Sequence, residues 1–152
     1  MMAALVKREK LGDKYMKIYE YRTTTRFSDT DSYGVVHHSN YFRLLEEARI
    51  DLMENELGIL MDDMEVKKIQ FPVTKIEAKY KHIMYGRERI LIQTLLEYNG
   101  TSKLVFHYKI LNGNNECVFE GLSEHIVTKN QELLFYLPEE LENKVISYLQ
   151  GL

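Results

Sequence analysis

Two carboxylates and two imidazoles lie close together in the stretch FSDTDSYGVVHHSN, residues 27–40. Asp31 follows Asp29 with one threonine between them, and His38 comes seven residues after Asp31. A carboxylate can attack a carbonyl carbon itself or activate a water molecule as a general base. The same residue types also build turns and helix caps, so the stretch alone leaves a catalytic and a purely structural role open.

His37 and His38 also raise the question of a bound metal ion. Adjacent residues in a turn seldom direct both rings at one ion, and no cluster of cysteines or histidines at ligand spacing accompanies them. The sequence therefore predicts no metal site. His82, His107 and His125 occur singly in strand-like segments, where packed or surface histidines are ordinary.

A turn followed by a helix must position these residues, and the flanking pattern predicts both. Alternating residues over 19–27 predict a half-buried strand. Turn formers then end the strand, and Gly34 is the one best suited to a positive φ. Ser39 or Asn40 could cap a helix over residues 41–57. The apolar residues of this helix cover a broad arc, so we expect it to pack against a sheet.

The rest of the chain reads as an antiparallel sheet. Residues 59–71 are ambiguous between a short helix and a loop, and then come four strand-like segments, at residues 76–84, 90–98, 104–111 and 117–127. Short links between consecutive strands predict a meander. Gly121, inside the last strand, predicts a bulge or bend. A closing helix is expected from Pro138. One helix beside such a sheet is α+β architecture.

Length and composition set further limits. With 152 residues, 45% hydrophobic and 28% charged, the chain fits a single domain over residues 1–152, with residues 1–16 as a frayed or surface extension. A net charge of -3 argues against a nucleic-acid partner. No apolar run approaches the roughly 20 residues that span a bilayer, and the opening MMAALV is too short for a signal-peptide core. Cys117 is the only cysteine, which suits a reducing cytoplasm. We expect a soluble, cytoplasmic protein without membrane insertion.

The motif and the order of elements resemble the hotdog-fold thioesterases, in which a curled antiparallel sheet wraps one long central helix. Within that fold the chain is most similar to the 4-hydroxybenzoyl-CoA thioesterase-like branch, which includes acyl-CoA thioesterases associated with the Tol-Pal envelope system. The resemblance covers roughly residues 17–150 in outline, a size ordinary for one domain. Its specific part is the stretch from Phe27 to Arg49. The matching residues there are Asp29, Thr30, Asp31, Gly34, Val35, Val36, His38, Tyr41, Glu46, Ala48 and Arg49.

The resemblance implies an acyl-CoA thioesterase that needs no cofactor, since CoA is part of its substrate. Asp31 would be the nucleophile or general base, and the sequence does not separate the two routes. By analogy the backbone N–H of His38, at the helix start, would polarise the thioester carbonyl. Asp29 would organise the turn. Glu46 is a reserve catalytic candidate, because a second hotdog lineage uses a carboxylate on the helix.

The resemblance also implies substrate contacts and assembly. Gly34, Val36 and Tyr41 are candidate substrate-binding residues from the motif, and Tyr41 is also an ordinary core candidate. Arg87 and Arg89 could meet the phosphates of CoA, although solvated strand faces carry the same basic residues. The family forms homodimers, and often homotetramers, with the active site shared across the subunit interface. An exposed sheet edge makes such assembly physically reasonable.

Two departures from the family pattern and two other functions stay open. His37 stands where many relatives have tyrosine, and Arg87 where an aspartate is frequent, so the acyl group is not encoded by the motif. A second enzyme reading is an acyl-carrier-protein thioesterase or a hotdog dehydratase. A third reading, from a different class, is a non-catalytic acyl-CoA-binding or scaffold protein, which would not need the Asp31 carboxylate.

Overall fold

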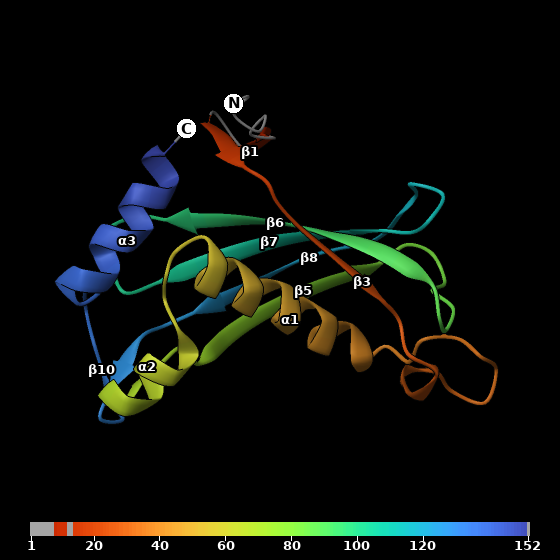
Figure 1. The fold of residues 1–152 in the computed structure, drawn as a ribbon, viewed down its shortest axis with the longest axis horizontal. Coiled ribbons are helices and arrows are strands. Elements are labelled where there is room, and N and C mark those ends of the chain that lie inside the picture. Colours follow the sequence, from red (N-terminus) through yellow and green to blue (C-terminus); the bar gives the residue numbers. More distant parts are fainter. Residues whose placement is uncertain (1–7, 12–13, 152) are drawn as a thin grey trace.

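The computed structural model describes residues 8–11 and 14–151. Its main layer is a five-stranded antiparallel sheet with the strand order β3-β6-β7-β8-β5 (Figure 1). The strands are β3 (Tyr19–Thr24), β5 (Val73–Tyr80), β6 (Arg89–Tyr98), β7 (Leu104–Leu111) and β8 (Cys117–His125). The long helix α1 (Asn40–Asn55) lies across one face of this sheet. The α+β class predicted from the sequence is confirmed.

Smaller elements complete the described part of the chain. They are β1 (Arg8–Leu11), β2 (Lys14–Lys17), the 3-10 turn η1 (Phe27–Asp29), α2 (Met61–Lys67), β4 (Ile69–Gln70), β9 (Thr128–Lys129), β10 (Glu132–Leu133) and α3 (Glu139–Gln150). The hairpin β1–β2 falls where the sequence shows no period and was not predicted; residues 1–7 and 12–13 of that extension lie outside the described residues. Within the described chain, no helix combines the length and the apolarity needed to cross a membrane.

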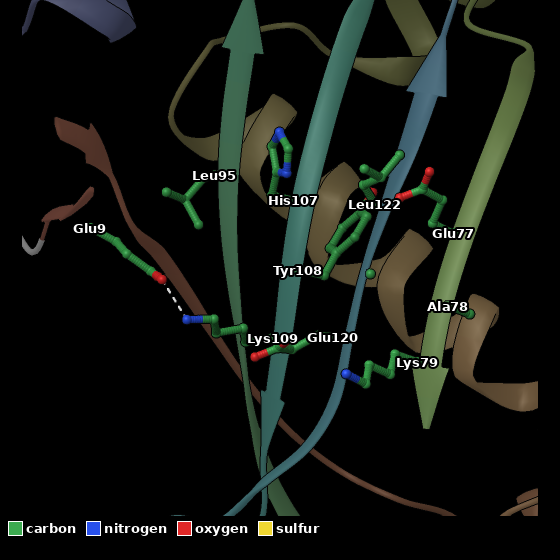
Figure 2. A pocket seen from close by; sticks show the side chains of 11 residues that line it. Glu9, Glu77, Ala78, Lys79, Leu95, His107, Tyr108, Lys109, Glu120 and Leu122 are labelled. Atoms are coloured by element: carbon green, nitrogen blue, oxygen red, sulfur yellow. Dashed lines mark hydrogen bonds and ion pairs between the residues drawn. The ribbon is translucent and has the colours of Figure 1, made fainter. Parts of the chain in front are cut away.

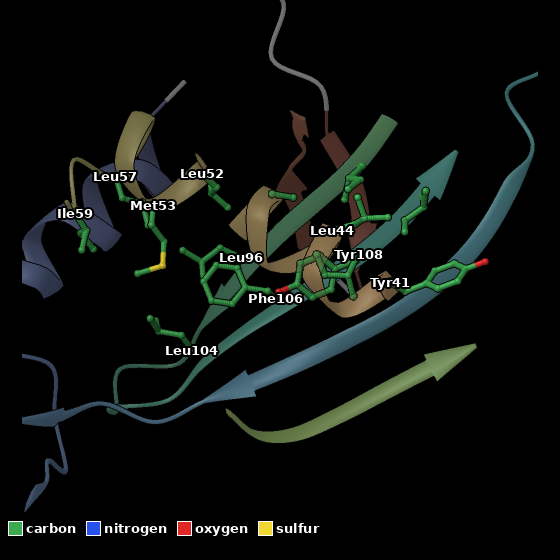
Figure 3. Close-up of a cluster of buried hydrophobic side chains, with 14 of the residues drawn as sticks. Tyr41, Leu44, Leu52, Met53, Leu57, Ile59, Leu96, Leu104, Phe106 and Tyr108 are labelled. Carbon is green, nitrogen blue, oxygen red and sulfur yellow. The ribbon is translucent and has the colours of Figure 1, made fainter. Parts of the chain in front are cut away.

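The core lies between α1 and the sheet. On α1 the buried positions recur at helical spacing and include Leu44, Ala48 and Leu52, all at 0% exposure. The facing strand β7 buries every second residue, with Phe106 and Tyr108 the largest (Figure 3). Burying a side chain of this size stabilises a protein by roughly 1.5–3 kcal/mol. The helix is therefore held in place mainly by its apolar face.

The order of the strands corrects the predicted meander. β6, β7 and β8 are consecutive neighbours, but β5 pairs with β8 at the sheet edge and β3 pairs with β6. The segment read as a tight turn between β5 and β6 instead crosses the end of the sheet. There the N–H of Val36 donates to the carbonyl of Met84 at 2.8 Å, and that of Arg87 donates to the carbonyl of Thr25 at 3.0 Å. The crossing brings residues 84–88 against the aspartate-containing turn.

The predicted bulge at Gly121 is wrong. Both ladders of β8 run through Gly121 without a shift, and the irregularity of the β7–β8 ladder lies at Val118 of β8, because Ile110 pairs with Phe119 and Leu111 with Cys117. Glycine is needed at position 121 for a different reason. A Cβ there would lie 2.4 Å from the backbone carbonyl oxygen of Glu77, far inside normal contact. Gly121 therefore allows a close approach of the β5 and β8 backbones.

Candidate active site

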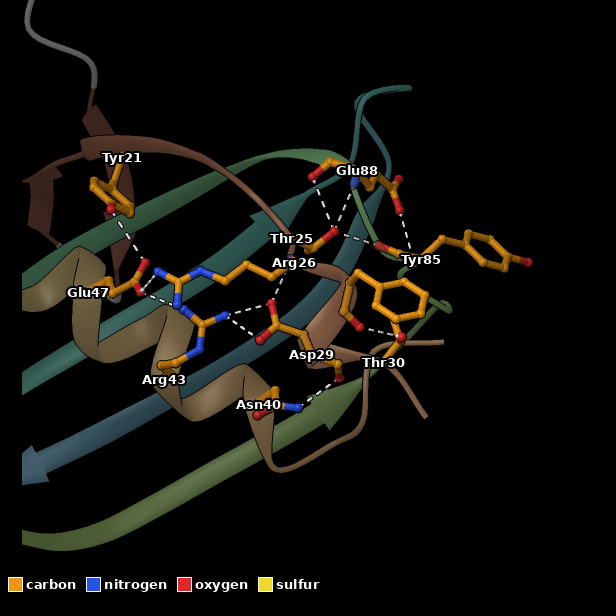
Figure 4. Close-up of polar contacts among 11 residues, drawn as sticks. Tyr21, Thr25, Arg26, Asp29, Thr30, Asn40, Arg43, Glu47, Tyr85 and Glu88 are labelled. Atoms are coloured by element: carbon orange, nitrogen blue, oxygen red, sulfur yellow. Dashed lines mark hydrogen bonds and ion pairs between the residues drawn. The ribbon is translucent and has the colours of Figure 1, made fainter. Parts of the chain in front are cut away.

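Asp29 ties the turn to the helix. Its carboxylate is buried and accepts hydrogen bonds from the Arg43 guanidinium at 2.6 Å and from the backbone N–H of Arg26 at 2.7 Å (Figure 4). Its backbone carbonyl accepts from the N–H of His37 at 2.9 Å and from the side-chain amide of Asn40 at 2.7 Å. These four contacts fix the first residues of α1 relative to η1. Asp29 therefore organises the turn, as expected from its type.

The ion pair of Asp29 with Arg43, called here the Asp29–Arg43 lock, extends to the exposed side of the helix. The guanidinium of Arg43 also donates to Glu47 at 2.5 Å, one turn further along α1. Partial burial disfavours the charged guanidinium, but the hydrogen bonds and negative charges of Asp29 and Glu47 outweigh that penalty and raise the pKa of Arg43. The guanidinium of Arg43 therefore stays charged at every pH at which the protein would work.

Asp31 lies at the tip of the same turn, and its side chain is exposed. Its Oδ1 accepts from the backbone N–H of Tyr33 at 2.8 Å, and its own N–H donates to the carbonyl of Val35 at 2.9 Å. Gly34 adopts φ +76°, the left-handed conformation that this tight turn needs and that the sequence predicted. Asp31 Oδ2 accepts no hydrogen bond from any residue that the structure describes. One carboxylate oxygen is anchored and the other is open to a ligand.

The segment just before α1 offers a hydrogen-bond donor seven residues after this carboxylate. Within residues 8–11 and 14–151, the backbone N–H of His38 donates no hydrogen bond. Ser39 precedes the helix without making a side-chain cap, and the rings of His37 and His38 are exposed and lie 4.1 Å apart. Free N–H groups at a helix start carry the positive end of the helix dipole. Such a donor can stabilise a developing oxyanion.

Val36 and Tyr41 are buried inside the protomer. Val36 is 4% exposed and Tyr41 3%, and the Tyr41 ring packs edge-on against Tyr80 at 4.8 Å and stacks on Phe119 at 5.5 Å. The hydroxyl of Tyr80 in turn donates to the carbonyl of His38 at 3.3 Å. These aromatic residues support the helix start from below. A substrate contact by Val36 or Tyr41 stays a prediction.

The two candidate phosphate-binding arginines lie on different surfaces. Arg87 adopts φ +58°, lies beside the Asp31 turn and holds its guanidinium 6.0 Å from the ring centre of the exposed Phe27. Gly86 makes this approach possible, because a Cβ there would meet Thr30 at 2.9 Å. Arg89 instead lines a groove with Arg22 on the sheet face turned away from α1. Only Arg87 is brought to the turn.

A hollow on the outer face of the sheet does not contain the motif. Its lining includes Glu9, Lys79, His107, Lys109 and Glu120, with the polar side chains turned away from α1 (Figure 2). Lys109 forms an ion pair with Glu9 of β1. Opposite charges pair across this surface, and none of the candidate catalytic residues reaches it.

Glu46 lies in a second groove, on the helix side. It is exposed on α1 and lines the groove with Arg49 and residues of α2. Eight residues separate it from His38, which is about 12 Å of helix. Within one chain, Glu46 and the Asp31 turn therefore lie at different positions along α1 and do not form one cluster.

The sequence pattern did not reveal a buried series of hydrogen bonds that includes His125. His125 is 0% exposed; its Nδ1 bonds the carbonyl of Phe71 at 3.0 Å and its Nε2 bonds Ser123 at 2.8 Å. Ser123 bonds the hydroxyl of Tyr108 at 2.7 Å. Burial, helped by the positive charge of Arg49, lowers the pKa of His125 to about 4, although the bond to Phe71 acts the other way. The only hint in the sequence is the two-residue spacing of Ser123 and His125, which places both on one strand face.

The depressed pKa of His125 predicts a pH-dependent stability. Unfolded His125 binds a proton at an ordinary pKa near 6.5, whereas the folded residue does so only near 4, so acid between these values favours unfolding. We expect this residue to remove about 2 kcal/mol from the free energy of unfolding between pH 7 and pH 5. Urea unfolding at both pH values measures it. His125→Asn should flatten the pH dependence, while the same change at the exposed His82 should not; an unchanged slope in His125→Asn would contradict the assignment.

A curled antiparallel sheet around one long helix, with an aspartate turn at the helix start, defines a hotdog-fold protein of the thioesterase type. The sequence matches the family described as "Thioesterase-like superfamily" over residues 25–145. The chain belongs to this family. The 4-hydroxybenzoyl-CoA branch within it stays a prediction.

Individual relatives agree with this assignment. A Bacillus subtilis protein that carries the provisional name acyl-CoA thioesterase YneP is 35% identical over 112 residues, which cover 73% of this chain and 80% of the relative. A 1,4-dihydroxy-2-naphthoyl-CoA hydrolase of Nostoc punctiforme is 26% identical, covering 87% and 86%. The crystal structure of DHNA-CoA thioesterase from Staphylococcus aureus superposes with a TM-score of 0.76 at 29% identity, covering 86% of this chain and 91% of that one.

Proposed function

We propose that this protein is an acyl-CoA thioesterase in which Asp31 acts on the thioester and the His38 backbone N–H stabilises the oxyanion. Thioester hydrolysis as the class of reaction follows from the family. The observation that carries the residue roles is the open Asp31 oxygen together with the unpaired N–H at the start of α1. Both groups are held in place by the Asp29–Arg43 lock, so the site is organised before substrate binds.

The chemistry needs no further side chain. Asp31 Oδ2 can remove a proton from a water molecule that attacks the thioester carbon, or can attack that carbon itself to give an anhydride that water then hydrolyses. In both routes the carbonyl oxygen becomes negatively charged, and a fixed N–H donor at that point contributes about 3 kcal/mol. Thiols are acidic enough that CoA leaves as a thiolate with little help from an acid.

We further propose that the working unit contains at least two copies. Among the strands that the structure describes, β5 has a neighbour on one side only. All eight of its residues are exposed, and Val73, Ile76 and Tyr80 present apolar surface there. Antiparallel pairing of two β5 edges would cover this surface and satisfy the free backbone groups. Arg87, beside the turn, would meet the phosphates of CoA. With Cys117 as its single cysteine, the enzyme would act in the reducing cytoplasm.

A screen of acyl-CoA hydrolysis tests the proposed function. Purified protein is mixed with straight-chain, branched and aromatic acyl-CoAs and with matching acyl-carrier-protein thioesters, and the release of free thiol is followed. We expect turnover of at least one acyl-CoA by a species that light scattering shows to be a dimer or larger. Binding of acyl-CoA without release of thiol would favour a scaffold protein, and turnover of carrier-protein thioesters alone would favour that enzyme class.

A further inference from the structure

The groove that contains Glu46 is lined by polar residues at one end and by apolar residues at the other. It runs between α1, α2 and the segment entering β5, with a volume of about 590 Å³. Met53, Met61 and Met64 line it where α2 covers the later part of α1, and Ile69 closes it. Met53, Met64 and Ile69 are buried side chains of the core, so packing holds the apolar floor of the groove in place. This end of the groove offers carbon and sulfur surface to a ligand.

The earlier part of the groove is polar. Glu46 and Arg49 lie there. Burial raises the pKa of Tyr108, and Arg49 is close enough to that residue to oppose part of the rise. Tyr108 belongs to the buried chain through Ser123 to His125, so the polar end is anchored in the core. The distance along α1 from Glu46 to Met53 is about 10 Å, the length of an extended chain of about eight carbons. An acyl thioester has the same order of groups, a polar head followed by an apolar tail.

The groove is continuous with the proposed subunit interface. Pro72 ends its lining and Val73 begins the exposed edge strand β5. When two such edges pair antiparallel, the Tyr80 end of one β5 lies beside the Val73 end of the other. The hydrogen bond from Tyr80 to the carbonyl of His38 shows that the start of α1 lies at the Tyr80 end. The helix start of one copy would therefore face the groove of the second copy.

We propose that this groove receives the acyl tail of a substrate whose thioester lies at the helix start of the second copy, and that the preferred substrates are flexible straight-chain aliphatic acyl-CoAs. The inference rests on the proposed function and deepens it. Methionine side chains are unbranched and adaptable, so they pack against a mobile alkyl chain of varying length. A flat aromatic acyl group, such as the relatives named as dihydroxynaphthoyl-CoA hydrolases take, would not need a lining of this length.

Filling the groove tests the proposal. Met61 is partly exposed on α2, and Met61→Trp adds bulk at the apolar end; Val66→Trp adds the same side chain on the same helix, at a position 83% exposed and outside the groove. Thiol release is measured with butanoyl-, hexanoyl-, octanoyl-, decanoyl- and benzoyl-CoA. In the wild type, kcat/KM should rise about fourfold for each methylene buried. Met61→Trp should lower kcat/KM for decanoyl-CoA at least about tenfold more than for butanoyl-CoA, and Val66→Trp should retain the wild-type profile.

Other results would overturn the inference. An equal loss on all substrates in Met61→Trp would mean that the groove is structural, and dissociation of the oligomer by this variant would mean that a second copy fills it. A wild-type preference for benzoyl-CoA would also contradict it. If Met61→Trp does not fold, Met61→Ala should shift the acyl length with the highest kcat/KM toward longer chains. An unshifted length optimum would also contradict the inference. Hydrolysis that does not depend on acyl-chain length would contradict this inference alone. The absence of hydrolysis of any thioester by the wild type would contradict both this inference and the proposed function.

Discussion

Asp29→Ala is expected to lower the free energy of unfolding by about 2–4 kcal/mol. The substitution removes a carboxylate that is 3% exposed and leaves the Arg43 guanidinium without its buried ion-pair partner. It also leaves the backbone N–H of Arg26 without its acceptor. Breaking a buried pair by removing one partner costs more than the pair contributes, because the remaining charge stays desolvated. Arg43 is partly exposed and keeps Glu47, so the cost should fall below that of a fully buried pair.

Guanidinium chloride unfolding and thermal melts measure this effect. For a chain of this length, the expected loss corresponds to a fall in Tm of about 5–15 °C. Glu47→Gln is the matched control, because it breaks the partly exposed i,i+4 pair to the same arginine and should cost less than about 1 kcal/mol. Equal stabilities for Asp29→Ala and Glu47→Gln would show that the buried carboxylate does not lock the turn.

The elements around the site follow largely from the sequence because their burial is one-sided. β7 was predicted over residues 104–111 and is observed as Leu104–Leu111, since its residues alternate between core and surface. α1 was predicted over residues 41–57 and is observed as Asn40–Asn55, its apolar arc facing the sheet. The ambiguous stretch before β5 proved to contain both α2 and β4. Periodicity predicts such helices and strands well, because the pattern of each depends on contacts along its own length.

The arrangement of the elements in space was harder to predict from the sequence. β5 alternates like the inner strands, so nothing in its pattern shows that it pairs with β8 and lies at the edge. The hairpin β1–β2 has no distinct period. Phe27, predicted as the last residue of a half-buried strand, is 73% exposed because the chain turns into η1 there. His125 looked like any lone histidine on a strand. Those features depend on long-range contacts, which a local pattern does not encode.

The candidate site was found through resemblance more than through geometry. Asp29 and Asp31 are the same residue type in the same turn, yet one is buried under Arg43 and the other is exposed. No local rule separates them, because the difference arises from Arg43, fourteen residues further along the chain. The structure shows that Asp29 joins the turn to the helix, and the role of Asp31 in the reaction stays a prediction.

Asp31→Asn is expected to lower kcat by at least about a thousandfold. Asparagine keeps an Oδ1 that can accept the hydrogen bond from Tyr33, so the turn should survive, but the amide neither attacks a thioester nor accepts a proton from water. Asp63→Asn is the control, since it makes the same change of charge at an exposed position on α2 outside the groove. Its kcat should stay within about twofold of the wild type, as for most surface substitutions.

Single-turnover hydrolysis by Asp31→Asn, with enzyme in excess over the best acyl-CoA, isolates the chemical step from product release. The predicted outcome is a rate constant at least about a thousandfold below the wild type, with the dissociation constant for the same acyl-CoA nearly unchanged. A variant that binds acyl-CoA normally and cleaves it at close to the wild-type rate would contradict the central assignment, and the open carboxylate of Asp31 would then have no part in the reaction.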